Sequence, residues 1–146
     1  MDINEHVKNG TVKKTIQSTE LVRSLLSMAN IKEQTVMTVT LTEFNISAYI
    51  PMAYDALREV LDALCILNGY KPQSHIHTGE IAKLLHPQFD FITFDRFRYA
   101  RNRINYYGEK VEFEQGKEFI QKILQMKKEV EKKVKTLLNN KGETSP

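Results

Sequence analysis

The residues of this chain best suited to chemistry lie close together between Arg98 and Gly108. On an α-helix, which has about 3.6 residues per turn, five polar side chains of this stretch share one face. These side chains are Arg98, Arg101, Asn102, Asn105 and Tyr106. They can hold RNA or another phosphate, because guanidinium groups bind phosphate oxygens in pairs. The same face can instead tie its helix to a neighbouring helix or to a second copy of the chain. The sequence leaves both interpretations open.

Other side chains with chemical potential are few. His75, His77 and Glu80 are residue types that bind metal ions. However, residues two apart on a helix point in different directions. We therefore predict no metal site and no cofactor. Cys65 lies in the most apolar part of the chain, where a thiol is typically buried and inert.

Composition restricts the class of protein. The chain has 146 residues, a net charge of +3, 41% hydrophobic and 27% charged residues, which is typical of one globular domain. No apolar run approaches the about 20 residues that a membrane span needs. Residues 1–14 lack the apolar core of a signal peptide, and a single cysteine fits a reducing compartment. These features predict a cytoplasmic protein with no membrane partner.

Apolar residues recur at steps of three and four over most of the chain, which predicts helices. We expect them at about 11–29, 46–67, 75–85, 91–107 and 114–139. Ser18 or Thr19 is an alternative start for the first helix, because Ser and Thr are favoured N-caps. Ser74 is a candidate N-cap of the third helix, and Gly108 a candidate C-cap of the fourth.

Residues 35–42 alternate between apolar and β-branched types and on their own resemble a strand. We find no partner strand for them, and a lone strand is unstable. We therefore expect a helical continuation or a second short helix there. The sequence thus predicts an all-α fold, an antiparallel bundle of four to five helices. Its expected parts are a flexible N-terminus at 1–10, one helical domain at 11–139 and a flexible tail at 140–146.

Three local features of the chain resemble those of the HEPN domains, which are small all-helical proteins, mainly of archaea and bacteria. The first combines YDALRE at 54–59, AL at 63–64 and NGYK at 68–71. The second is Ser74-His75 at the start of the short third helix. The third is RN at 101–102 followed by NYYG at 105–108. The resemblance covers roughly residues 21–138.

The resemblance implies a helical bundle that pairs as a homodimer, and often a ribonuclease encoded beside a nucleotidyltransferase-like antitoxin. The family signature is an arginine, a polar residue and a histidine four to six positions further on. Arg101 and Asn102 match its beginning, but positions 106–108 hold Tyr106, Tyr107 and Gly108. Catalysis would then fall to Arg101 and Tyr106, as in a metal-independent endoribonuclease. A phenol with a pKa near 10 is a poor base. The absence of the histidine therefore impairs cleavage more than it impairs phosphate binding.

Three functions remain open at this stage. The first is a HEPN-like protein that binds RNA or a nucleotide as a homodimer, a ribonuclease-type toxin or defence component with a degenerate catalytic motif. The alternative is a non-enzymatic partner subunit of a nucleotidyltransferase-like protein. The third is a helical dimer without a ligand, in which the Arg98-to-Tyr106 face is the interface.

Overall fold

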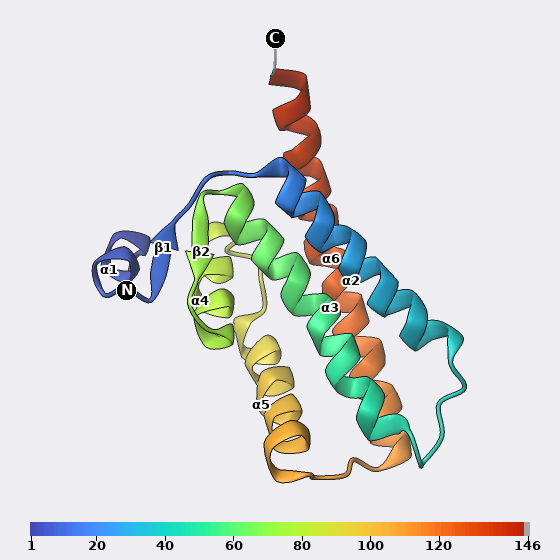
Figure 1. The fold of residues 1–146 in the computed structure, drawn as a ribbon. Helices are drawn as coiled ribbons and strands as arrows, with labels where there is room; N and C mark the ends of the chain where they lie inside the picture. Colours follow the sequence, from blue (N-terminus) through green and yellow to red (C-terminus); the bar gives the residue numbers. More distant parts are fainter. Residues whose placement is uncertain (145–146) are drawn as a thin grey trace.

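The computed structural model describes the backbone of residues 1–144 and the side chains of residues 1–141. These residues form six helices and one two-stranded sheet (Figure 1). The helices are α1 (Ile3–Lys8), α2 (Thr19–Thr38), α3 (Ile46–Leu67), α4 (His75–Leu85), α5 (Phe91–Tyr107) and α6 (Phe113–Thr144), and the strands are β1 (Val12–Lys14) and β2 (Tyr70–Pro72). The prediction of a mainly helical fold is confirmed.

Helix α3 is the centre of the molecule. It lies between α2 and α6, and α4 and α5 pack on its remaining side (Figure 1). A helix covered on several sides must be apolar nearly all round, and 14 of its 22 residues are buried. Gly116 allows α6 to come close to α3, because a Cβ at this position would lie 2.5 Å from Cγ1 of Ile46. The hydrophobic core therefore surrounds α3.

Local cap residues set the bounds of α4 and α5. The hydroxyl of Ser74 accepts a hydrogen bond from the backbone N–H of His77 at the start of α4. The carboxylate of Asp90 accepts one from Thr93 at the start of α5. Gly108 ends α5 with φ = 64°, a left-handed conformation that glycine adopts without steric cost. The caps predicted at Ser74 and Gly108 are confirmed, and so are the bounds 75–85 and 91–107.

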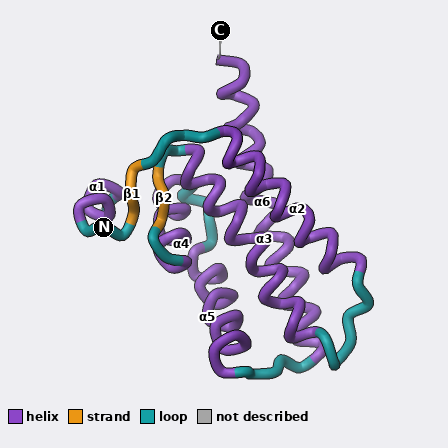
Figure 2. Tube along the Cα trace, in the orientation of Figure 1, coloured by secondary structure: helices purple, strands orange, loops and turns teal. Residues whose placement is uncertain are grey.

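The N-terminal part of the chain differs from the prediction. Residues 1–10 were expected to be flexible, yet residues 3–8 form α1 and His6 is only 3% exposed. Residues 12–14 form β1 rather than the first turn of a helix, and they pair antiparallel with β2, between α3 and α4 (Figure 2). Helix α2 begins at Thr19 with the hydroxyl of Ser18 as its cap, which confirms the alternative start.

Two other segments were predicted only in part. Of residues 35–42, positions 35–38 continue α2 as a helix, and 39–42 lie in the connection to α3. The expected flexible tail began at residue 140, but α6 extends to Thr144, and residues 145–146 lie outside the described part of the chain. Within residues 1–144, each helix is too short or too polar to cross a membrane.

Candidate anion-binding site

Tyr54 connects the three helices that form the candidate site. It lies on α3, is fully buried and stacks on Phe94 of α5, with ring centroids 5.8 Å apart and an interplanar angle of 21°. Its hydroxyl lies 3.4 Å from Nδ1 of His75, the first residue of α4. The guanidinium carbon of Arg101 lies 5.7 Å from the centre of the Tyr54 ring, within the range of a cation–π interaction. One aromatic ring thus contacts a histidine and an arginine from different helices.

Close packing of α4 on α5 holds this ring in place. A Cβ at Gly79 of α4 would lie 2.7 Å from the ring of Phe94. Only glycine therefore lets α4 come this near to α5 while Phe94 stacks on Tyr54. The arrangement around Arg101 depends on packing as well as on polar contacts.

We call the group of Tyr54, Arg58, His75, Arg98 and Arg101 the Arg101 cluster. Two of its arginines have acidic partners: Nη1 of Arg58 lies 2.8 Å from a carboxylate oxygen of Asp62, and Nε of Arg98 lies 2.8 Å from one of Asp95.

Arg101 differs from the other two arginines. Among residues 1–141, no carboxylate forms an ion pair with it. Its Nη1 donates instead to Oδ1 of Asn102 at 3.2 Å and to the hydroxyl of Tyr106 at 3.5 Å. The Nε atoms of Arg58 and Arg101 are buried and have no hydrogen-bond partner in the part of the chain whose side chains are described. The cluster thus contains more cationic donors than acceptors.

Burial changes the acid–base properties of the other two members, and the charges of the arginines and of Asp55 modify its effect. Burial, followed by the charges of Arg58 and Arg101, lowers the pKa of His75 to about 4. Burial raises the pKa of Tyr54 well above its usual value, although the same arginines oppose this change. At neutral pH the phenol therefore keeps its proton and the imidazole is neutral, and the two groups lie within hydrogen-bond distance of each other.

The predicted residues Arg98, Arg101, Asn102 and Tyr106 come together only in part. Arg101 contacts Asn102 and Tyr106, whereas the nearest partner of Arg98 is Asp95. Asn105 is exposed. A hollow of about 510 Å³ lies beside this group, and it is lined by Tyr99, Asn102, Arg103, Tyr106, Tyr107 and Glu109.

Sequence reasoning missed Tyr54, Arg58 and His75 as members of the site. Tyr54 and Arg58 are four residues apart on α3 and so share a face, which was a usable signal. His75 comes from another helix, and no pattern in the sequence indicates that α4 brings it to Tyr54. His75 belongs to this cluster, whereas His77 lies near His6 and Glu80.

Comparison of the chain with protein-family models, curated proteins and solved structures found no match. The resemblance to HEPN domains stays a prediction. A function is therefore inferred from the arrangement of charge and hydrogen-bond donors around Arg101.

Proposed function

We propose that the Arg101 cluster binds a phosphate group of RNA. The supporting observation is the unbalanced charge of Arg101, which has no carboxylate partner among residues 1–141 and a buried Nε without a hydrogen bond. A buried N–H without a partner costs about 1–3 kcal/mol. A phosphodiester supplies the missing negative charge and acceptors, and arginine binds it with two parallel hydrogen bonds.

Exposed tyrosines beside Arg101 favour RNA over a small phosphate. Tyr99, Tyr106 and Tyr107 are 59%, 70% and 82% exposed, and all three line the hollow next to Asn102. Exposed aromatic rings stack on the bases of single strands, at about 1–3 kcal/mol per base. A cationic group for the backbone next to aromatic rings for the bases is the combination that a single-stranded RNA requires.

His75 raises the question of cleavage, since it supplies a histidine to the arginine site from α4 instead of α5. With a pKa of about 4 it is neutral at pH 7, so it can accept a proton, but it is a weak base for abstracting one from a 2′-hydroxyl. Binding is therefore the proposed function. Metal-independent endoribonuclease activity is the second candidate, and it depends on His75 and on Arg101.

We propose in addition that the chain pairs as a homodimer, as the resemblance to HEPN domains implies. Ile92 in the first turn of α5 is an apolar side chain that is 68% exposed, and a second copy packed against it would leave the tyrosines of the hollow free for RNA. Sedimentation of the wild type and of Ile92→Glu tests this part of the proposal, with a dimer expected only for the wild type.

The proposed function is tested by RNA binding at low salt. A fluorescently labelled single-stranded RNA is titrated with wild-type protein, Arg101→Ala and Arg96→Ala, and cleavage of the same RNA is followed on gels. Arg96 is the matched control, because it is an exposed arginine of the same helix that belongs neither to the cluster nor to the lining of the hollow. Both variants lose one positive charge, so non-specific attraction falls equally.

We expect Arg101→Ala to lose at least about tenfold in affinity, and Arg96→Ala to stay close to the wild type. Equal affinities of the wild type and Arg101→Ala would rule out the proposal, as would an equal loss in both variants. If the wild type cleaves the RNA and both Arg101→Ala and His75→Gln do not, metal-independent endoribonuclease activity is established.

A further inference from the structure

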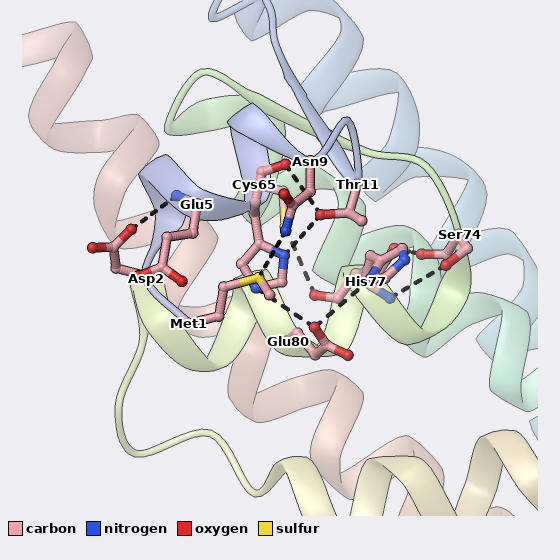
Figure 3. A network of polar contacts seen from close by, with 11 residues as sticks. Met1, Asp2, Glu5, Asn9, Thr11, Cys65, Ser74, His77 and Glu80 are labelled. Atoms are coloured by element: carbon pink, nitrogen blue, oxygen red, sulfur yellow. Dashed lines mark hydrogen bonds and ion pairs between the residues drawn. The ribbon is translucent and has the colours of Figure 1, made fainter.

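A second group of polar side chains joins α4 to the N-terminal part of the chain, which His77 and Glu80 face (Figure 3). It contains His6 of α1 and His77 and Glu80 of α4. One ligand atom from each residue lies within 4.8 Å of the other two. Nε2 of His6 is 3.5 Å and Nδ1 of His77 is 3.7 Å from the same carboxylate oxygen, Oε2 of Glu80.

These separations are too long for good hydrogen bonds and suit a shared metal ion. A nitrogen–oxygen hydrogen bond is normally about 2.7–3.2 Å long. Metal–ligand bonds of about 2.1 Å in a tetrahedral zinc site separate neighbouring ligand atoms by about 3.4 Å. In addition, Nδ1 of His77 is buried and has no hydrogen-bond partner among the described side chains. The three ligand atoms are therefore placed for coordination and not for pairing with one another.

The hydrogen bonds of His6 prepare it as a ligand. The hydroxyl of Thr11 donates its only proton to the backbone carbonyl of His6 at 3.1 Å. It must therefore accept a hydrogen bond from Nδ1–H of the His6 ring, 2.8 Å away. This fixes the tautomer in which Nε2 carries a lone pair, and Nε2 is the atom that faces Glu80. Zinc-binding histidines usually hold their second ring nitrogen in this way.

We propose that Nε2 of His6, Nδ1 of His77 and a carboxylate oxygen of Glu80 bind a divalent transition-metal ion of the zinc class. Two imidazoles and one carboxylate are a typical zinc ligand set, and a water molecule completes the tetrahedron. The ion would link residue 6 to residues 77 and 80 and so attach α1 to α4. This site is separate from the Arg101 cluster and does not depend on the proposed RNA binding.

The test is calorimetric titration of ZnCl₂ into untagged protein that has been treated with EDTA. One ion per chain is expected for the wild type. Glu80→Gln and His77→Gln keep the size of the side chain closely enough to fold, because both residues are partly exposed. His86→Gln is the control, since it removes one histidine in the loop after α4. Thr11→Val removes only the hydrogen bond to His6, so we expect it to weaken binding about 10- to 100-fold.

Glu80→Gln and His77→Gln should weaken binding by more than Thr11→Val does, and His86→Gln should leave it unchanged. Imidazole nitrogen NMR of the zinc-loaded wild type gives an answer that does not depend on any variant: Nε2 of His6 and Nδ1 of His77 must shift. Three results would each overturn the proposal: no zinc binding by the wild type, binding by His77→Gln and Glu80→Gln as tight as that of the wild type, or NMR shifts at other ring nitrogens.

Discussion

The interface of α2 with α6 and the Arg101 cluster both place long cationic side chains inside the protein, but they balance the charge differently. Lys127 of α6 is fully buried, and its Nζ lies 2.5 Å from Glu33 of α2 and 3.0 Å from Glu131. Two further lysines, Lys128 and Lys135, approach the same two carboxylates at 3.7 and 3.9 Å. We call the group of Glu33, Lys127 and Glu131 the Lys127 cluster. Its central cation has two anions, whereas Arg101 has none among residues 1–141.

This difference separates a structural role from a binding role. Burying a charge costs several kcal/mol unless an opposite charge accompanies it. In the Lys127 cluster, the carboxylates of Glu33 and Glu131 offset this free-energy cost, so no ligand is required. In the Arg101 cluster the cost is only partly offset, and an external anion would offset the rest. We therefore expect substitutions in the first cluster to change stability and substitutions in the second to change binding.

The largest expected effect is that of Lys127→Met. Removing the only fully buried cation among residues 1–141 leaves Glu33 buried without its main partner. We expect the free energy of unfolding to fall by about 3–5 kcal/mol, measured by urea denaturation. The control is Lys122→Met, which removes an exposed lysine paired with exposed Glu118 on the same helix, and should change stability by less than about 1 kcal/mol.

A double variant tests whether the unpaired charge of Glu33 causes the loss of stability in Lys127→Met. Lys127→Met combined with Glu33→Met removes both charges, so it should recover at least half of the lost stability. A double variant that is no more stable than Lys127→Met alone would show that packing, and not unpaired charge, explains the loss.

The second prediction reverses this pattern at the Arg101 cluster. Arg101→Met keeps much of the apolar stem and removes the buried Nε that has no partner, so stability should change by less than about 1 kcal/mol. Its affinity for single-stranded RNA should fall by about 1.5–3 kcal/mol. The slope of log K against log salt should become smaller by about 0.7, as expected for one lost phosphate contact. A large loss of stability with unchanged affinity would assign Arg101 a structural role like that of Lys127.

The third prediction concerns pH. The pKa of His75 is about 4 in the folded protein against 6.5 for an ordinary histidine. The unfolded chain therefore binds more protons between pH 6.5 and 4, and this residue destabilises the fold progressively as the pH falls through that range. Because the ring is partly exposed, we expect about 1–2 kcal/mol, less than the full shift would imply.

The pH dependence of the free energy of unfolding is compared between the wild type and His75→Gln, because other groups titrate in the same pH range. Burial raises the pKa of Asp62, which acts in the opposite direction, and hydrogen bonds lower the pKa of Asp90 and Glu112. These groups are present in both proteins and cancel. Denaturation curves at pH 7 and pH 4 should show a smaller loss for His75→Gln. Parallel pH profiles would mean that burial and the neighbouring arginines do not hold His75 neutral.

Part of the fold could be predicted because its signals are local. Ser74 and Gly108 act on the backbone within a few residues of themselves, and the start of α4 and the end of α5 follow from them. In the N-terminal segment, the cap at Asp2 starts α1, but contacts distant in sequence place the segment. Helix α1 is ordered by the burial of His6 near Glu80, and β1 by pairing with residues 70–72, and both contacts join parts of the chain that are far apart in sequence.

The same reasoning applies to the site. Arg101 and Tyr106 lie on one helix, and helical spacing was enough to place them together. Tyr54 and His75 come from two other helices, and their proximity to Arg101 depends on how α4 packs against α5 through Gly79. A helical pattern identifies the face of a helix but not what that face meets, so the arginine was found and the histidine near it was not.

The smallest expected effect is that of Gly108→Ala, which tests whether stability and binding can be separated at all. Gly108 has φ = 64° and no side-chain or backbone atom within 4 Å of the Cβ that alanine would add. The cost is therefore conformational, about 1 kcal/mol of stability in urea denaturation. Because the cap ends α5 beyond Tyr107 and makes no contact with Arg101 or Tyr54, RNA affinity at 25 °C should stay within about twofold of the wild type. A tenfold loss of affinity from this cap alone would mean that RNA binding follows the stability of α5. Stability and binding would then not be separable, and the roles of Lys127 and Arg101 would differ only in the size of their effects.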